Sequence, residues 1–472
     1  MKRVFLFLCI LLLAVACMGC HGDTPSHTGT DTSADMSADT ATSPSADSER
    51  PPYDSRPEST EEAPETKPEV VLPFTPATSE LPIISIDTNG VVLESDENRS
   101  KEYVDMTLTL AGTADPLIDV HGSIRLRGNS TYDFVKKPYR IKLDQKHSLF
   151  GLEKAKSWVL LADYLDPSTL HNYAALTLAG TSEHLDFVPT PHKVNLYFNG
   201  EYAGIYTLCE QVQEQAGRLD LETEITRSMK ELSDYNFLIC LNYNAPEKPG
   251  AKEGETYFYL SNCQRYFELE YPTKEDFPTE EQFRRFFDAL EDYMRETVKA
   301  FQNSNRSYPN KNVDMDTLTD LYIVDRIMGE RDHHWKSVFM YYRGAEGDPK
   351  LHFGPPWDYD FCMYTDWTAE PNEEFDLTNR FNPAEASVFY SPFLNSTYYS
   401  RRVAERYREH FSDALTEVIG KVQAQVAAME ESLALNQDRW YSDKPTITEN
   451  NIEFFVEYLK NMKARMDREW SK

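Results

Sequence analysis

Positive charge is scarce in this sequence of 472 residues. Lys and Arg together number 48 against 78 Asp and Glu, which gives a formal net charge of −30. A chain this acidic repels phosphate backbones, and this excludes a general nucleic-acid binder. Residues 21–80 alone hold 13 Asp and Glu against three Lys and Arg. The sequence from residue 81 onward still carries −22, which is typical of an exported, soluble surface.

The apolar run near the N-terminus is too short to cross a bilayer. It covers Val4 to Val15 behind the basic pair Lys2 and Arg3, whereas a spanning helix needs about 20 apolar residues. Residues 1–20 are therefore interpreted as an export signal.

The export signal ends in a possible lipid attachment site. The stretch Ala14-Val15-Ala16-Cys17 fits a bacterial lipobox. This predicts lipidation of Cys17, with Cys20 as the second choice, and an extracytoplasmic protein anchored to a bacterial membrane. The alternative is ordinary cleavage after Ala16 without a lipid.

Large apolar side chains are nearly absent from residues 21–80, which are rich in Ser, Thr, Asp, Pro and Glu. Such a segment cannot bury enough surface to offset the entropy lost on ordering. We therefore expect a disordered tether that joins the membrane to a folded domain at residues 81–472.

Cysteine is also sparse in the region expected to fold. Only Cys209, Cys240, Cys263 and Cys362 lie there, and their spacing fits no zinc motif. Cys240 and Cys263 could pair outside the cell. The preferred interpretation is that all four are small buried apolar residues.

The remaining composition is that of a folded protein with a mixed secondary structure. Hydrophobic residues make up 40 % and aromatic residues 12 %, which excludes a chain disordered throughout. Alternating apolar residues and turn signals predict strands in the first part of the domain, where Asn199-Gly200 marks a hairpin. These strands are expected at 82–86, 103–110, 123–127, 139–143, 194–198 and 203–208, with one helix at 168–178.

The second part of the domain shows helical periodicity. Thr279 and Gln282 form a capping-box pattern ahead of an apolar face that starts at Phe283. Further helices are expected at 316–328, 401–437 and 451–470. The sequence therefore predicts an α+β fold in two lobes, β-rich over about 81–275 and helical over about 276–472.

Two carboxylates follow segments that are expected to meet. The apolar runs Val338 to Tyr342 and Leu351 to Phe353 predict a hairpin, which would bring Asp332 and Asp358 to the same end. Paired carboxylates could hold a hard divalent cation such as Mg²⁺. The alternative is that Asp332 caps a turn and Asp358 is a solvated loop acid.

A basic stretch stands out against the acidic background. Arg125 and Arg127 lead into Gly128-Asn129-Ser130-Thr131, and Lys136 to Lys142 follows. A nucleotide phosphate would explain this charge, and the turn offers free backbone N–H groups. Alternatively, these cations neutralise the acids of the chain itself. Separately, Glu210 ends a strand, where it could orient a lysine of a neighbouring strand.

Taken in order, these clusters resemble the CotH family of spore-coat-type atypical protein kinases. The resemblance covers most of residues 81–465. It is carried by Arg127 to Ser130 with Lys136 to Lys142, by Leu161 to Tyr164 and the following helix, by Asn199 to Glu210, by Asp332, and by Pro356-Trp357-Asp358-Tyr359-Asp360.

The resemblance implies an atypical kinase-like fold and a reaction. A member of this family would use ATP with Mg²⁺ or Mn²⁺ to phosphorylate Ser and Thr on secreted or cell-surface proteins. Separately, the Ser and Thr content of the predicted tether makes it a candidate substrate. Asp332 would be the catalytic-loop aspartate, and Asp358 would hold the metal together with Asp332 and Asp360.

The resemblance also assigns the phosphate-binding side chains. Lys142 would reach the phosphates with Glu210 as its partner, and Lys137 and Arg140 compete for that role. Arg127, Gly128, Asn129 and Ser130 would form the turn over the phosphates.

Two positions depart from the family pattern. Ser337 stands five residues after Asp332, where many relatives have a metal-binding Asn, and no Gly follows Asp360. These departures leave open a catalytically inactive binding module of the same fold. A metal-dependent phosphohydrolase using the same acids is the third alternative.

Overall fold

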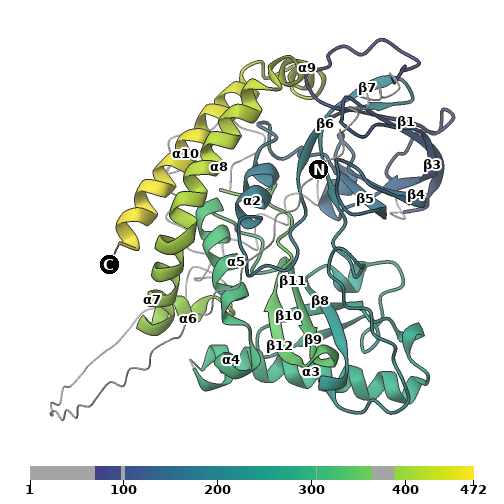
Figure 1. The fold of residues 1–472 in the computed structure, drawn as a ribbon. Coiled ribbons are helices and arrows are strands. Elements are labelled where there is room, and N and C mark those ends of the chain that lie inside the picture. Colours follow the sequence, from purple (N-terminus) through teal and green to yellow (C-terminus); the bar gives the residue numbers. More distant parts are fainter. Residues whose placement is uncertain (1–69, 97–100, 304–305, 364–386, 472) are drawn as a thin grey trace, which may run out of the picture. The chain divides into compact units, whose positions relative to one another are not determined.

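The computed structural model describes residues 70–96, 101–303, 306–363 and 387–471 (Figure 1). The predicted export signal, both candidate lipidation cysteines and residues 21–69 of the predicted tether lie outside these ranges. Residues 70–80 pack on the first strands instead of extending the tether. Phe74 stacks on Tyr197 with ring centroids 4.6 Å apart, so the folded part begins before Leu81.

Seven strands of the N-terminal part close into a barrel, in the order β1-β2-β3-β4-β5-β7-β6. Strands β1 and β6 close it by pairing in parallel, and the other neighbours are antiparallel. Alternate side chains point inward, so Ile141 and Trp158 are fully buried while Lys142 is exposed. The strands are β1 (Ile83–Asp87), β2 (Val104–Ala111), β3 (Leu117–Leu126), β4 (Tyr139–His147), β5 (Ala155–Leu161), β6 (His192–Phe198) and β7 (Glu201–Glu210).

The predicted hairpin at Asn199-Gly200 is confirmed between β6 and β7. Both turn residues have positive φ angles, 51° and 81°, which a two-residue turn of this kind requires.

A second sheet of five strands has the order β12-β11-β8-β10-β9. Strands β11 and β12 form the antiparallel hairpin that the two apolar runs predict. Because β8 pairs with β11, strands from both sides of residue 276 share this sheet. The strands are β8 (Asn236–Asn242), β9 (Tyr257–Leu260), β10 (Arg265–Tyr271), β11 (Lys336–Arg343) and β12 (Asp348–Phe353).

Helices dominate the C-terminal part and share one large apolar core with the second sheet. Figure 1 shows α8 and α10 side by side, in agreement with their contacts. The α-helices are α2 (His171–Ala179), α3 (Glu280–Gln302), α4 (Ser307–Asn312), α5 (Met315–Met328), α6 (Ser391–Asn395), α7 (Thr397–Arg406), α8 (Ser412–Ala427), α9 (Glu430–Trp440) and α10 (Ile447–Glu469), with a π-helical turn at Tyr407–Phe411.

The predicted start of α3 is confirmed, but only one half of its capping box is seen. The Thr279 hydroxyl accepts a hydrogen bond from Gln282 N at 3.2 Å. The Gln282 side chain turns away and donates to Thr226 O at 2.7 Å. The apolar face that begins at Phe283 is buried, as its spacing predicts.

The mixed α+β class is therefore confirmed, with a β-rich N-terminal part and a helical C-terminal part. The kinase-like, two-lobed arrangement stays a prediction, and strand alternation does not predict that the barrel closes.

All four cysteines of the folded region are free thiols, and Cys209, Cys240 and Cys362 are buried. Within the described ranges, no helix has both the length and the apolar composition to span a membrane.

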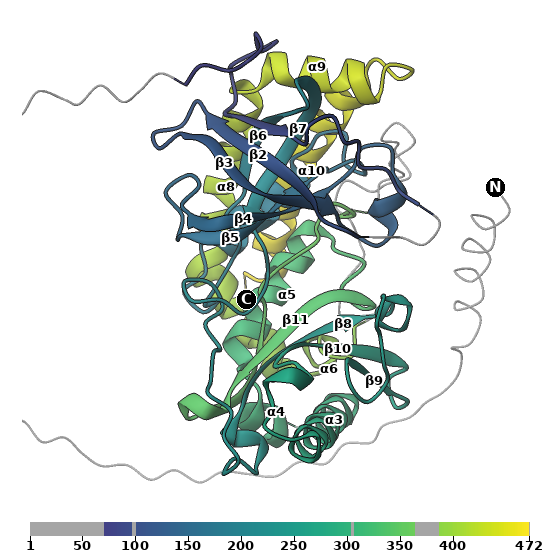
Figure 2. The same ribbon diagram turned by 90° about the vertical axis from the view of Figure 1, so that its right-hand side faces the viewer.

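A buried lysine joins the barrel to the C-terminal helices. Lys136 is fully buried, and its ammonium nitrogen donates to Ile205 O at 2.6 Å and to Asn436 Oδ1, in α9, at 3.1 Å. Both ribbon views place α9 beside β7 (Figures 1 and 2). The close approach of α9 to β7 requires Gly204, since a Cβ atom there would lie 2.7 Å from Asn436 Oδ1. Burial lowers the pKa of Lys136 to about 7, and a neutral amine still has two protons for its two acceptors.

We expect Lys136 to make stability depend on pH. The unfolded chain holds this proton up to about pH 10.4, whereas the folded protein releases it near pH 7. Unfolding free energy should therefore rise between these values by up to about 1.4 kcal/mol per pH unit. Chemical denaturation across this range should show the rise in the wild type and not in Lys136→Met. The exposed Lys156→Met is the matched control, and equal slopes in all three proteins would contradict the assignment.

Candidate active site

A sharp turn after α5 positions Asp332. The helix ends at Gly329, which adopts the left-handed conformation with φ 65°. The Asp332 backbone N–H then donates to Glu330 Oε1 at 2.6 Å, and Asp332 O accepts from the N–H groups of Trp335 and Lys336. These bonds fix the backbone of Asp332 immediately before β11 begins.

Asp358 follows the other strand of the hairpin, and the structure brings it close to Asp332. The ammonium nitrogen of Lys336 lies 2.9 Å from Asp332 Oδ2 and 3.8 Å from Asp358 Oδ2. The two carboxylates are 23 % and 31 % exposed, so the pair opens to solvent. Sequence spacing thus predicts the meeting of the two acids but not the lysine between them.

Charges at this site shift one another's protonation. Burial raises the pKa of Asp358, but Lys336, the Ser337 hydroxyl and Arg127 outweigh it and bring the pKa below its usual value. Burial and the charge of Asp358 hold the pKa of Asp360 well above its usual value. Burial lowers the pKa of Lys336, but Asp358 and Asp332 reverse this and raise it. Of these two aspartates, Asp360 therefore takes up a proton more readily.

Ser337 supports Asp358 directly. Its hydroxyl donates to Asp358 Oδ2 at 2.7 Å. Ser337 and Asp358 both have positive φ angles, 62° and 71°, a conformation that is sparsely populated outside glycine and clusters at functional sites. The serine that departs from the family pattern therefore has a defined contact with the aspartate.

The first part of the basic stretch covers the Asp358 loop. The Arg127 guanidinium lies 5.2 Å from the centre of the Trp357 ring, a cation–π contact. Burial lowers the pKa of Arg127, and the charges of Asp358 and Asp360 act against this. Gly128 (φ 94°) makes the turn that follows, where a Cβ atom would lie 1.9 Å from Thr131 Oγ1. Asn129 and Ser130 continue this turn, and Ser130 is exposed.

The other basic residues proposed to bind phosphate make their contacts away from Asp358. Lys137 Nζ donates to Ser95 Oγ and Tyr132 O, both at 3.0 Å, which is a local structural role. Arg140 lies opposite Arg125 on the outer face of the barrel and donates to Gln213.

Lys142 and Glu210 do not form the pair that the resemblance implies. Glu210 is opposite Trp158 in the sheet, whereas Lys142 is opposite Ser157, so the two side chains point to opposite faces. Glu210 instead accepts a hydrogen bond from Thr190 N at 2.7 Å. Burial raises the pKa of Glu210.

Three arginines of the basic stretch, and Arg218 in the loop after β7, form no ion pairs within the described residues. Within the described residues, Arg125, Arg127, Arg140 and Arg218 make no ion pair at all. In the same residues, the Nε atoms of Arg125, Arg140 and Arg218 are buried without a hydrogen-bond partner. These arginines are therefore not held in ion pairs with the chain's own acids, although the charge of Arg127 lowers the pKa of Asp358.

A different lysine–carboxylate pair is buried beside the site. Asp163, which has φ 50°, accepts hydrogen bonds from Lys193 Nζ at 3.0 Å, Thr207 Oγ1 at 2.5 Å and Asn172 Nδ2 at 2.9 Å. Asn172 Oδ1 in turn accepts from Tyr359 N at 2.9 Å. Sequence reasoning missed this pair. Its signals are Lys193, within a mostly apolar strand, and Asp163, within the segment Leu161 to Tyr164 that carries part of the family resemblance.

His333 joins the Asp332 turn to the Asp358 loop. Its Nδ1 lies 2.9 Å from Asp325 Oδ2 and its Nε2 lies 2.8 Å from Trp357 O. Both partners are acceptors, so both ring nitrogens carry protons. Burial lowers the pKa of His333, but Asp325 and Glu330 outweigh it and raise the pKa to about 10. Asp325 also accepts from the hydroxyl groups of Tyr359 and Tyr390.

The side chains at this site offer some, but not all, of the ligands that a divalent cation needs. Within the described ranges, no three His, Cys, Asp or Glu side chains converge as metal ligands. Asp358 and Asp360 are nevertheless close enough for the charge of Asp358 to raise the pKa of Asp360, and a bound cation would favour the ionised form of both. Two carboxylate oxygens with water or phosphate oxygens suit Mg²⁺, which keeps several non-protein ligands.

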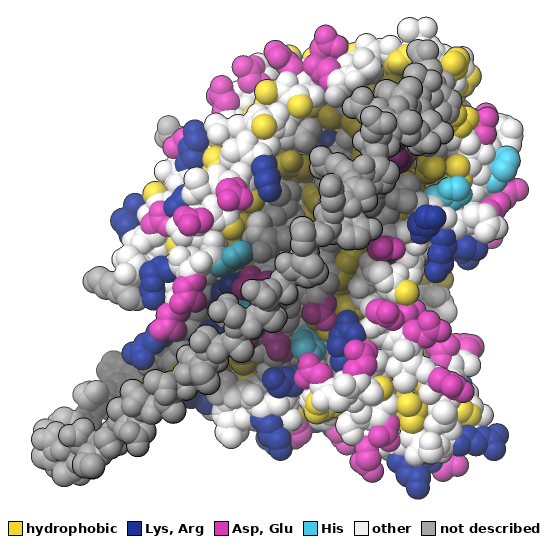
Figure 3. Space-filling model, viewed as in Figure 1, with side chains coloured by type: hydrophobic (Ala, Val, Ile, Leu, Met, Phe, Trp, Pro, Cys, Tyr) yellow, Lys and Arg dark blue, Asp and Glu magenta, His cyan; other side chains and the backbone are white. Residues whose placement is uncertain are grey.

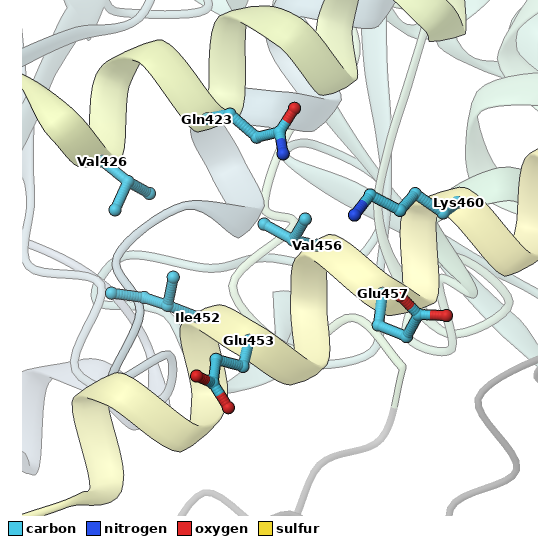
Figure 4. A pocket seen from close by; sticks show the side chains of 7 residues that line it. All are labelled: Gln423, Val426, Ile452, Glu453, Val456, Glu457 and Lys460. Carbon is cyan, nitrogen blue, oxygen red and sulfur yellow. The ribbon is translucent and has the colours of Figure 1, made fainter.

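A pocket of about 300 Å³ lies elsewhere, between α8 and α10 (Figure 4). Val426, Ile452 and Val456 form its apolar floor, and none of its lining residues belongs to the elements that carry Asp332 or Asp358. On the face shown in Figure 3, acidic and basic side chains are interspersed.

The sequence matches the family described as CotH kinase protein over residues 124–466. The chain belongs to the CotH family. The match spans the basic stretch, the Asp163 segment and both aspartate loops. A search of curated proteins finds no match.

We expect His333 to be essential for the stability of this CotH-family domain. Replacing it by Gln leaves Asp325 without its cationic partner in a buried site, which typically costs about 3–5 kcal/mol. Urea unfolding of His333→Gln should show this loss. His334→Gln, at the adjacent half-buried histidine, should change the unfolding free energy far less, and equal effects of both changes would contradict the role of His333.

Proposed function

We propose that this protein is an extracytoplasmic kinase that transfers phosphate from ATP to Ser and Thr of secreted or cell-surface proteins. The meeting of Asp332 and Asp358 around Lys336 at the end of one hairpin carries the proposal. Membership of a kinase family supports it. Phosphoryl transfer needs mainly positioning and neutralisation of charge, and this arrangement offers both.

The residues at the hairpin end divide into roles. Asp332, partly exposed at the turn, would accept the proton of the acceptor hydroxyl. Asp358 and Asp360 would hold Mg²⁺ or Mn²⁺, which when bound supplies positive charge to the phosphates. Arg127 and Lys336 would add fixed positive charge at the same place, and the turn at Gly128 offers backbone N–H groups.

The arginines favour a kinase over a module that binds partners through surface aromatics. The Nε atoms of Arg125 and Arg140 are buried without a hydrogen-bond partner in the described residues, and an anion bound at this face would satisfy them. Arg125 and Arg140 extend the positive charge from Arg127 along β3 and β4, which suits a ligand with several phosphates. A phosphohydrolase would leave free phosphate instead of a phosphoprotein.

The decisive experiment combines nucleotide binding with phosphate transfer. We expect ATP with Mg²⁺ to raise the melting temperature of the wild type, and transfer of labelled phosphate to fall at least about 100-fold in Asp358→Asn. Arg127→Met should weaken nucleotide binding, while the exposed Lys156→Met should match the wild type. A melting temperature unchanged by nucleotide, or full transfer in Asp358→Asn, would reject the proposal.

The predicted tether is a proposed substrate of the same enzyme. Residues 21–69 contain eight Ser and eight Thr among twelve Asp and Glu. We expect mass spectrometry after incubation with ATP to find phosphate on this segment in the wild type and none in Asp358→Asn. Phosphorylated product that carries no modified residue within 21–69 would refute this part.

We also propose that the protein is exported and is lipidated at Cys17 or Cys20.

A further inference from the structure

The backbone of the Asp358 loop is held by a side chain from another element. Asp358 has φ 71°, and a residue other than glycine keeps such a conformation only where its surroundings enforce it. The next amide, Tyr359 N, donates to Asn172 Oδ1 at 2.9 Å. Asn172 therefore fixes the peptide group that directly follows the strained residue.

Asn172 itself has only one orientation available. Its Nδ2 donates to Asp163 Oδ1 at 2.9 Å, and the other oxygen of Asp163 is occupied by Lys193 and Thr207. A flipped amide would turn Nδ2 toward the Tyr359 N–H and turn Oδ1 toward the Asp163 carboxylate, which loses both bonds. The charge on Asp163 thus decides which atom Asn172 presents to the loop.

The support behind Asn172 is rigid. Asn172 is 3 % exposed and lies in the first turn of α2, which packs against α5 and α8. Asp163 follows β5, Lys193 lies in β6, and Thr207 lies in β7. The chain of bonds therefore connects three barrel strands with the Asp358 loop through a single amide.

We propose that Asn172 is a positioning residue that holds Asp358 in its working conformation, under the control of the Asp163–Lys193 pair. The proposal rests on the proposed kinase function for its catalytic consequence. Its structural core, the constraint on the Tyr359 amide, stands on the hydrogen bonds alone.

Three variants test the constraint. Asn172→Ala removes both bonds without adding charge, and alanine suits a helix. Asn172→Asp keeps the shape but turns a second carboxylate toward Asp163. In the double variant Asp163→Asn with Asn172→Asp, one carboxylate oxygen at position 172 accepts a hydrogen bond from Tyr359 N. The other accepts from the amide nitrogen at position 163, and the amide oxygen at position 163 accepts from Lys193 and Thr207. The hydrogen bond between positions 163 and 172 then runs in the opposite direction, and all the bonds are restored.

Hydrogen exchange of the Tyr359 amide gives the readout that does not depend on activity. We expect exchange of the segment around Tyr359 to speed up about tenfold in both single variants and to return toward the wild type in the double variant. Unchanged exchange in Asn172→Ala would overturn the proposal. Faster exchange in the single variants without recovery in the double variant would also overturn it, because the defect would then be general.

Kinetics test the catalytic consequence separately. The single variants should lower kcat about 100-fold, since displacement of a reacting group by about 1 Å has this effect, while KM for the acceptor protein stays within about twofold of the wild type. The double variant should recover most of kcat. If the wild type transfers no phosphate, the proposed function fails, but the exchange experiment still decides the role of Asn172.

Discussion

The site depends on holding two carboxylates together in a partly buried place. Asp332 and Asp358 share Lys336, whose ammonium lies within 4 Å of both. Without that cation the two negative charges would repel each other, and the loops that carry them would separate. Arg127 over Trp357 and the Ser337 hydroxyl add further compensation at Asp358. The hairpin sets the acids side by side, and these contacts offset the repulsion between them.

Backbone strain explains why so many buried polar groups surround the site. Asp163, Ser337 and Asp358 all have positive φ, and each such residue costs about 1–3 kcal/mol. Each is bonded to a side chain or backbone group from another element. His333 between Asp325 and Trp357 O has the same function for the two loops. A network satisfied in this way can hold a single conformation, because losing one member leaves the others buried and unpaired.

Local patterns in the sequence predict the parts of the fold that depend on neighbouring residues. The turn at Asn199-Gly200, the cap at Thr279 and the hairpin of β11 and β12 follow from turn chemistry and periodicity. Closure of the barrel depends on the pairing of β1 with β6, strands that are far apart in the sequence, so no local pattern indicates it. The Lys142–Glu210 pair was wrong for a related reason, because the faces of the two residues are set by the register of β5 with both neighbours.

The net charge of −30 makes the lack of ion pairs at Arg125, Arg127 and Arg140 significant. In a chain with 78 acidic residues, ion-pair partners for three arginines are easily found, and surface arginines such as Arg284 and Arg285 have them. Arg125, Arg127 and Arg140 form no ion pair within the described residues, although burial lowers the pKa of Arg127 and Arg140. Direct ion pairs would satisfy these groups permanently and close the site to other anions. Leaving them unpaired keeps positive charge available to an anion that binds and leaves, as a nucleotide must in each turnover.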